Sequence, residues 1–259
     1  MFCGCKYCEA ARKQKGKSIR TRAGAQVDDS ILIDFSVDAY HHIAHGGLDM
    51  SSIEYVLLTH SHADHFFAGN LVNALPPMAA ADAVTHKYRF FGNEKCATMF
   101  EAALSEKSAA DQYLSFTVVK DNEPVSLGDY VITPIATLHD PQEECFIYSI
   151  AKDGKTLLYG HDSAMFTPAV WQKLARHKFS CVVLDCTSVM QANAFESHMS
   201  FYDNLAIKAR MLAEGMADEN TSFIATHFAH TFNPLQERLE KEMFPHGFLP
   251  AYDGMEHVF

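Results

Sequence analysis

Four side chains of types that commonly bind metal ions lie within six residues of the sequence, directly after an apolar run. They are His60, His62, Asp64 and His65, and the run is Ser52–Leu58. The run predicts a buried strand, and residues at the end of a strand are well placed to form a site. His60 and His62 point the same way in an extended segment, whereas Asp64 and His65 follow a turn. The spacing therefore predicts two cations held side by side.

Paired divalent cations make hydrolysis the natural reaction. Two such ions lower the pKa of a shared water from about 15.7 towards about 7 and neutralise charge on a phosphoryl or acyl oxygen. Imidazole suits zinc and iron, whereas carboxylates also suit manganese, so zinc, manganese and iron all stay open as the ions. The alternative is that these histidines only cap a helix or sit as satisfied polar residues.

The elements that must position these residues alternate between strands and helices. Expected strands lie at residues 31–33, 52–58, 116–119, 130–132, 146–150, 156–159, 181–184 and 223–225, and expected helices at 66–75, 94–104, 168–176, 201–215 and 234–243. The block 116–159 should be antiparallel, with Asp153-Gly154 as a hairpin turn. Thr167 should cap the helix that Pro168 opens. The pattern predicts an α/β fold, with two sheets packed face to face and helices outside.

The motif His-x-His-x-Asp-His after a short apolar strand resembles the signature of metallo-β-lactamase-fold hydrolases. The resemblance implies an αββα sandwich of two mixed sheets, and three further ligands that each follow a strand. The chain offers His139, Asp162 and His227 in that order. The resemblance assigns one ion to His60, His62 and His139, the other to Asp64, His65 and His227, and a bridging role to Asp162. An acid at Asp34 is expected to fix the imidazole tautomers.

Three cysteines near the N-terminus, Cys3, Cys5 and Cys8, offer thiolates for one tetrahedral ion that lacks a fourth ligand. His230 is our choice to complete a structural zinc site. This knuckle at residues 3–8, together with Thr226–His230, resembles the phosphodiesterase family of bacterial phosphonate metabolism, which hydrolyses phosphoribosyl 1,2-cyclic phosphate. The likeness extends through Leu184–Thr187, His198 and Tyr252–Glu256. It implies that His198 is a proton donor or phosphate contact and suggests a homodimer, and we also count Asp64 as catalytic.

Composition limits the partners. The chain has 259 residues, 48% of them hydrophobic, and no linker or repeat divides it, so we expect a single domain over residues 1–259. A formal charge of −11 disfavours nucleic acid. The basic stretch Arg12–Arg22 is read as a solvated face, with a phosphate contact as the alternative. The sequence has neither a long apolar run nor a signal peptide, so we expect a cytoplasmic protein with no membrane partner.

The resulting hypothesis is a phosphodiesterase that opens a small cyclic phosphodiester by attack of a metal-bridged hydroxide, with His198 as the acid. A thioester or lactone hydrolase is the enzymatic alternative, and a metal-binding scaffold without catalysis is the other. The remaining histidines are expected to be solvated or to fill the core: His41, His42 and His45 at helical spacing, and the isolated His86, His177, His246 and His257. The scattered cysteines, Cys96, Cys145, Cys181 and Cys186, are expected to fill the core.

Overall fold

The computed structural model describes residues 3–80 and 86–259, which form two compact units. One unit comprises the residues up to Arg20, Pro124–Pro141 and Ile147–Phe259, and the other comprises Thr21–Glu123 and Gln142–Phe146. Each unit has its own sheet and its own apolar core. We call them the second-sheet unit and the first-sheet unit, after the order in which their sheets appear along the chain. One domain over residues 1–259 stays a prediction.

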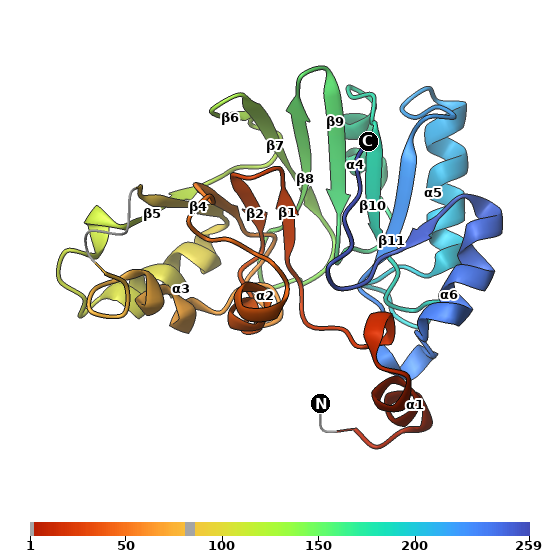
Figure 1. Ribbon diagram of the computed structural model, residues 1–259. Coiled ribbons are helices and arrows are strands. Elements are labelled where there is room, and N and C mark those ends of the chain that lie inside the picture. Colours follow the sequence, from red (N-terminus) through yellow and green to blue (C-terminus); the bar gives the residue numbers. More distant parts are fainter. Residues whose placement is uncertain (1–2, 81–85) are drawn as a thin grey trace. The chain divides into compact units, whose positions relative to one another are not determined.

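The first-sheet unit is built on a five-stranded sheet whose strands follow chain order (Figure 1). The strands are β1 (Ala25–Val27), β2 (Ile31–Ile33), β3 (Tyr55–Leu57), β4 (Tyr88–Gly92) and β5 (Leu114–Val118). β1 pairs antiparallel with β2, and every later pair is parallel. All residues of β2 and β3 are buried, as is typical of parallel strands covered on both faces.

Helices cover this sheet with apolar side chains. They are α2 (Ala39–His45), α3 (Glu94–Leu104) and the 3₁₀ helices η2 (Ala68–Ala74) and η3 (Ala110–Gln112). Leu71 of η2 and Phe100 of α3 join Val56 and Phe90 of the strands in one core. The Asn93 side chain accepts a hydrogen bond from the backbone N–H of Cys96, which fixes the start of α3.

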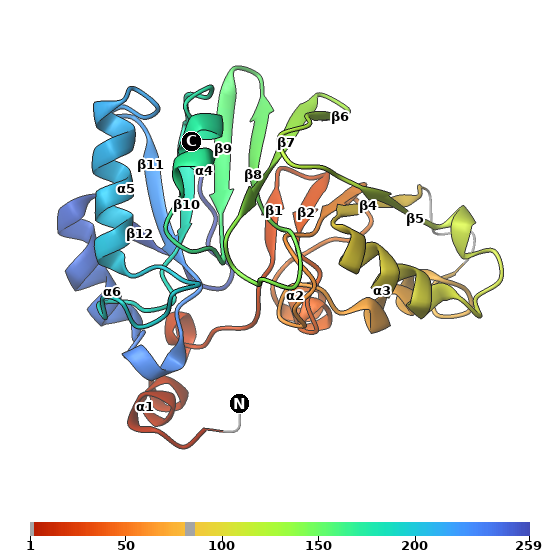
Figure 2. The ribbon, with the colours of Figure 1, turned by 180° about the vertical axis from the view of Figure 1, so that it is seen from behind.

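The second-sheet unit carries a seven-stranded mixed sheet in the order β12-β11-β10-β9-β8-β7-β6 (Figure 2). The strands are β6 (Val125–Leu127), β7 (Tyr130–Thr137), β8 (Cys145–Lys152), β9 (Lys155–Gly160), β10 (Cys181–Asp185), β11 (Ser222–Thr226) and β12 (Leu249–Pro250). β9 to β12 are parallel, whereas β8 and β9 form an antiparallel hairpin. Its turn places Asp153 at φ 50° and Gly154 at φ 77°, as a type I′ turn requires.

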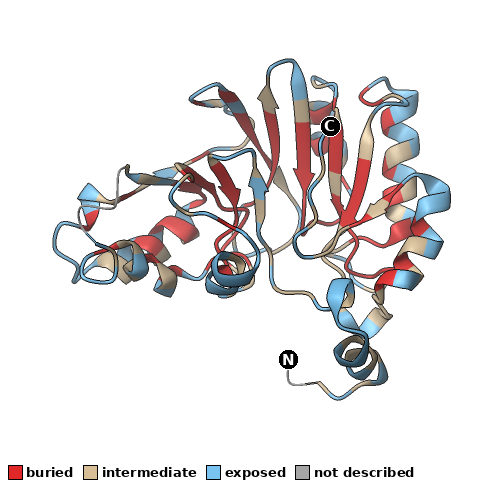
Figure 3. Cartoon of the chain, in the orientation of Figure 1, coloured by how far each residue is buried: buried red, intermediate tan, exposed pale blue. Residues whose placement is uncertain are grey.

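Three α-helices pack on this second sheet, and each buries apolar side chains. They are α4 (Pro168–Leu174), α5 (Phe201–Ala213) and α6 (Gln236–Met243), whereas α1 (Lys6–Gln14) buries no residue. Short 3₁₀ turns lie at η1 (Gly16–Ser18), η4 (His230–Phe232) and η5 (Phe244–His246). Figure 3 shows the contrast between the buried strands and the exposed outer faces of the helices. The core of this unit includes Trp171 of α4, Ile207 of α5 and Leu239 of α6.

The expected α/β fold class, with two mixed sheets and helices, is confirmed. One expectation was wrong: residues 116–119 do not belong to the antiparallel block, because β5 pairs parallel with β4. The expected helix at 66–75 is the 3₁₀ helix η2, and the strand expected over 52–58 is confined to Tyr55–Leu57. Thr167 caps α4 as predicted, with its side chain accepting from Val170 N–H.

The four scattered cysteines lie in the cores, as expected: Cys96, Cys145, Cys181 and Cys186 are each at most 1% exposed. Among the described residues, no helix combines the length and apolar character needed to cross a membrane.

A capping box fixes the start of α5, the helix that directly follows His198 and Met199. Ser200 accepts from the backbone N–H of Asp203, and the Asp203 carboxylate accepts from the backbone N–H of Ser200. We expect Ser200→Ala to lower the free energy of unfolding by about 1–2 kcal/mol, because the cap is lost. Ser200→Asp should retain most of the stability. Urea denaturation of both variants checks this, and equal loss in both would contradict it.

Candidate metal centre

In the first-sheet unit, one buried carboxylate and one threonine fix two of the predicted ligand histidines. Asp34 follows β2, and its oxygens accept from the Thr59 backbone N–H (2.9 Å) and from the Thr59 hydroxyl (2.9 Å). His65 Nδ1 lies 2.7 Å from Asp34 Oδ2, so this ring nitrogen donates. His60 Nδ1 lies 3.1 Å from Thr59 Oγ1, whose own proton is directed at Asp34. Both rings therefore carry their lone pair on Nε2, the nitrogen that can bind a metal ion.

The rest of the His-x-His-x-Asp-His motif gathers around this pair. The ring centroids of His60 lie 4.4 Å from His62 and 4.1 Å from His65. Asp64 Oδ2 lies 3.6 Å from His65 Nε2. His60 and His65 are buried, whereas the Asp64 side chain is 43% exposed. Four potential ligands of this unit thus lie together, and the expected role of Asp34 beside the histidines is confirmed.

The second-sheet unit brings together the other predicted ligands, each of which follows a strand. His139 follows β7, Asp162 follows β9 and His227 follows β11. His139 Nε2 lies 3.3 Å from Asp162 Oδ2, and His227 Nδ1 lies 3.5 Å from Asp162 Oδ1. His139 Nδ1 donates to the carbonyl oxygen of Ser197 at 3.3 Å, so its lone pair is also on Nε2. This half of the set therefore centres on Asp162.

A second carboxylate–threonine pair, which the sequence analysis did not single out as functional, fixes His227. Asp185 at the end of β10 is fully buried and accepts from the Thr187 hydroxyl at 2.8 Å. His227 Nδ1 donates to Thr187 Oγ1 at 2.7 Å, which again leaves the lone pair on Nε2. The signal was present in the sequence, because Asp185 follows an apolar strand just as Asp162 does.

His198 lies among the carboxylates of this unit. Its Nδ1 is 2.8 Å from Asp162 Oδ1 and 3.2 Å from Asp185 Oδ2. Burial opposes protonation, but the two carboxylates outweigh it and raise the pKa of His198 to about 9. The ring of Phe195, which is 47% exposed, contacts the imidazole edge-on at a centroid distance of 5.7 Å. His198 therefore belongs to this cluster, next to an exposed aromatic side chain.

Backbone strain accompanies the site in both units. Asp34, Asp162 and His227 adopt left-handed conformations with φ of 63°, 49° and 61°. Non-glycine residues rarely adopt this conformation, which costs about 1–3 kcal/mol and persists only where the surroundings hold the residue in place. Each of the three directly follows a strand or lies two residues beyond it. The strain turns these side chains out of the strand direction and into the cluster.

Glu143 braces the loop that carries the histidine motif, and no sequence pattern had indicated it. Its carboxylate accepts from the Ser61 backbone N–H (2.9 Å), the Ser61 hydroxyl (2.6 Å), the Asn93 amide (2.7 Å) and the Lys95 ammonium (3.2 Å). Burial raises the pKa of Glu143, but these donors outweigh it and hold the pKa below its usual value. The residue between His60 and His62 is thereby fixed.

The cysteine knuckle also assembles around its predicted partner. Potential ligand atoms of Cys3, Cys5, Cys8 and His230 all lie within 4.8 Å of one another. Cys8 Sγ is 3.4 Å from His230 Nδ1, and α1 begins directly after Cys5. Hydrogen bonds from the backbone at Cys8 and from His230 lower the pKa of Cys5 to about 6. Three sulfurs and one imidazole are the donor set of a closed tetrahedral zinc site.

The basic stretch is tied to other parts of the chain more than expected. The Arg20 guanidinium donates to the carbonyl oxygen of Pro234 at 2.8 Å and to the Gln236 side chain at 2.6 Å. Burial lowers the pKa of Arg20 to about 10. Arg22 pairs with Asp38 at 3.0 Å. The interpretation of this stretch as a solvated face was thus wrong for Arg20. Both of its Nη atoms already donate within the chain, which leaves fewer N–H groups for a phosphate.

The chain belongs to the beta-lactamase superfamily, because the model of the beta-lactamase superfamily domain matches residues 30–228. The match includes the His-x-His-x-Asp-His motif, His139, Asp162, Asp185 and His227. Comparison with curated protein sequences finds no match.

Solved structures support the same fold. A diphosphatase of the PhnP family is 19% identical with a TM-score of 0.73, covering 100% of this chain and 91% of its own. Zinc-bound PqqB from Methylobacterium extorquens is 18% identical with a TM-score of 0.64, over 100% and 94% of the two chains. The short form of human tRNase Z is 13% identical with a TM-score of 0.64, over 90% and 91%.

Family and donor set together define a hydrolase of the metallo-β-lactamase fold. The residues fit a divalent ion, because each unit presents imidazole Nε2 lone pairs next to a carboxylate and holds the rings by their Nδ1 atoms.

The Glu143 brace makes stability depend on pH. A carboxyl whose pKa is lowered on folding contributes stability above its unfolded pKa of about 4.3, and this is lost as pH falls through the folded value. We expect Glu143→Gln to lower the free energy of unfolding by about 1–3 kcal/mol at pH 7. The difference in free energy of unfolding between wild type and variant should shrink as the pH falls below about 4, because the wild-type carboxyl becomes protonated. Urea denaturation across this range tests it, with the exposed Glu101→Gln as control. A gap that does not change with pH would contradict the ionic role.

Proposed function

We propose that the chain is a metal-dependent phosphodiesterase whose histidine and aspartate side chains would hold two divalent ions. His60, His62 and His139 would hold one ion, Asp64, His65 and His227 would hold the other, and Asp162 would be shared by the two ligand sets. The observation that carries this proposal is the orientation of the rings. His60, His65, His139 and His227 all use Nδ1 for a hydrogen bond, which puts the lone pair that can bind a metal ion on Nε2.

Bound at these residues, zinc, manganese or iron would supply an activated water at neutral pH and would neutralise charge that develops on the phosphoryl oxygen. The protein contributes the other parts of the reaction. His198, held at Nδ1 by two carboxylates, keeps a proton on Nε2 and donates it to the leaving oxygen. Asp185 and Thr187 fix the rings of His198 and His227 and so act as positioning residues. Asp64 serves as both ligand and catalytic carboxylate.

We also propose that Cys3, Cys5, Cys8 and His230 hold one structural zinc ion. The knuckle runs into the first turn of α1, which contains Cys8, and His230 lies three residues after His227. A closed site of this kind would fix the N-terminal segment against the loop that carries a catalytic ligand. Its role is mechanical, because a four-coordinate site leaves no position for substrate.

The proposed substrate is a small cyclic phosphodiester. Two similar structures, the PhnP-family diphosphatase and human tRNase Z, bear names of enzymes that act on phosphate compounds or RNA, which supports the choice of phosphorus chemistry. The charge of −11 disfavours a long polyanion, so we propose no nucleic-acid partner. A cytoplasmic homodimer without a membrane partner completes the proposal. Thioester or lactone hydrolysis and a scaffold without catalysis are the alternatives.

Metal analysis tests the ligand sets. We expect about three bound ions per wild-type chain. Asp64→Ala should lose an active-site ion and keep the zinc of the knuckle, whereas Cys5→Ala should lose only the knuckle ion. Elemental analysis by mass spectrometry after exhaustive dialysis gives the counts. Loss of the same ion from both variants would contradict the assignment of two separate sites.

Turnover tests the reaction class. We expect hydrolysis of bis(p-nitrophenyl) phosphate that a chelator abolishes and divalent ions restore, and slower hydrolysis of thioesters. His198→Gln should lower kcat by about 10²- to 10⁴-fold, because the proton donor is lost, while metal content stays that of the wild type. A chelator-sensitive thioesterase that leaves phosphodiesters intact would replace the proposal. Full metal loading without any turnover would favour the scaffold.

A further inference from the structure

We infer that His41 and His45 on α2 form a surface site for one further divalent cation of borderline softness, such as Cu²⁺, Ni²⁺ or Zn²⁺. Neither residue belongs to the ligand sets proposed above. The inference is independent of the proposed function and replaces the reading of these two histidines as merely solvated.

The two rings lie at the separation that chelation needs. His41 and His45 are four residues apart in the helix Ala39–His45, so their side chains lie on one face. Their ring centroids are 5.0 Å apart and their planes are tilted by 48°. With metal–nitrogen distances of about 2.0–2.1 Å, two imidazoles on one ion have centroids about 4.5–5.2 Å apart for bond angles between about 90° and 109°. Little rearrangement is therefore needed to close the chelate.

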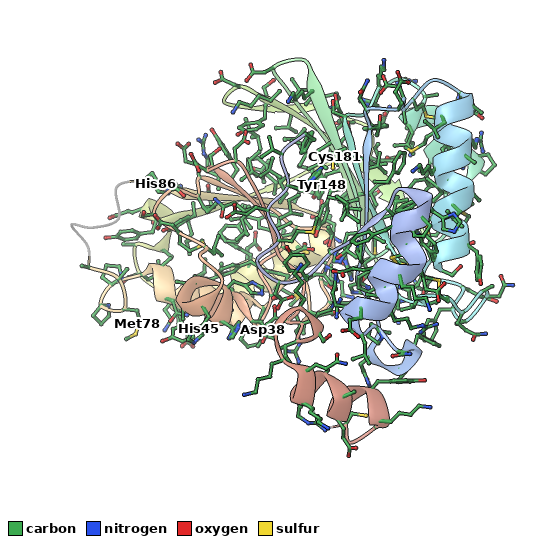
Figure 4. All side chains as sticks on the ribbon, turned by 45° about the vertical axis from the view of Figure 1, so that its right-hand side comes forward. Asp38, His45, Met78, His86, Tyr148 and Cys181 are labelled. Carbon is green, nitrogen blue, oxygen red and sulfur yellow. The ribbon has the colours of Figure 1, made fainter. Side chains whose placement is uncertain are left out.

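Both imidazoles are accessible to ions in solution. His41 and His45 are exposed, whereas the intervening His42 is partly buried and its Nε2 lies 2.8 Å from Thr21 Oγ1. Figure 4 labels Asp38 and His45, which mark the two ends of α2. The pair at positions 41 and 45 is thus the one that faces solvent, with His42 committed to the neighbouring segment.

A chelate at this position would act on the helix itself. α2 has only seven residues, and Gly46 and Gly47 follow it. Helices this short depend on outside contacts, because nucleation is costly. An ion that joins residues four apart closes the last turn and stabilises the helix by mass action. Imidazole donors and the general order of divalent affinities place Cu²⁺ above Ni²⁺ and Zn²⁺.

The test uses the protein with its resident metals, titrated with Ni²⁺ by isothermal calorimetry near neutral pH. We expect wild type to bind one further Ni²⁺ per chain, and His41→Ala and His45→Ala each to bind it at least about tenfold more weakly, because one chelating arm is lost. Alanine favours helix, and circular dichroism checks that the variants fold. The double variant His45→Ala/Ile43→His keeps the number of exposed histidines but moves one to another face. It should bind as weakly as His45→Ala.

Two calorimetric results would overturn the site. One is a wild type that takes up no Ni²⁺ beyond its resident ions, and the other is a double variant that binds as tightly as wild type. Paramagnetic broadening of imidazole proton signals gives a second readout, which should affect His41 and His45 first. Broadening of histidines outside α2 before those of His41 and His45 would also overturn it. None of these measurements depends on hydrolytic activity.

Discussion

The arrangement of the candidate centre depends on one interaction that occurs in both units: a buried carboxylate holds a threonine hydroxyl, and the threonine oxygen then accepts from a histidine Nδ1. Asp34 and Thr59 do this for His60, and Asp185 and Thr187 do it for His227. A neutral imidazole has one donor and one acceptor nitrogen, so fixing the donor also fixes the acceptor. The same device thus sets the tautomer and the direction of ligands that lie 167 positions apart in the sequence, from 60 to 227.

Strand topology explains why these residues gather. In the second-sheet unit β9, β10 and β11 are parallel neighbours, so Asp162, Asp185 and His227 leave the same edge of the sheet. In the first-sheet unit β2 and β3 are parallel, which brings Asp34 to Thr59. The left-handed backbone at Asp34, Asp162 and His227 then redirects the chain. Such conformations persist because the sheets on one side and the hydrogen bonds on the other over-determine them.

The sequence allowed the prediction of those parts that are set locally. The motif from His60 to His65, the N-cap at Thr167 and the turn at Asp153-Gly154 each follow from neighbouring residue types. The pairing of β5 with β4 could not be predicted, because β4 was not recognised and the alternation in 116–119 suits either sheet. Glu143 could not be found either. It reaches Ser61 across 82 positions, and nothing in its neighbours distinguishes it from a surface acid.

Buried negative charge ties the proposed metal ions to the folding of the chain. Asp34, Asp162 and Asp185 are each at most 3% exposed, and burying a carboxylate is costly unless donors or cations compensate. Asp34 and Asp185 receive backbone and hydroxyl protons in addition to imidazoles. Asp162 lies within 3.5 Å of the rings of His139, His198 and His227, and two of these rings belong to the proposed ligands. Divalent cations bound here would add positive charge next to this buried carboxylate and so offset the cost of burying it. The side chain proposed to bind both ions would therefore couple metal binding to the stability of the fold.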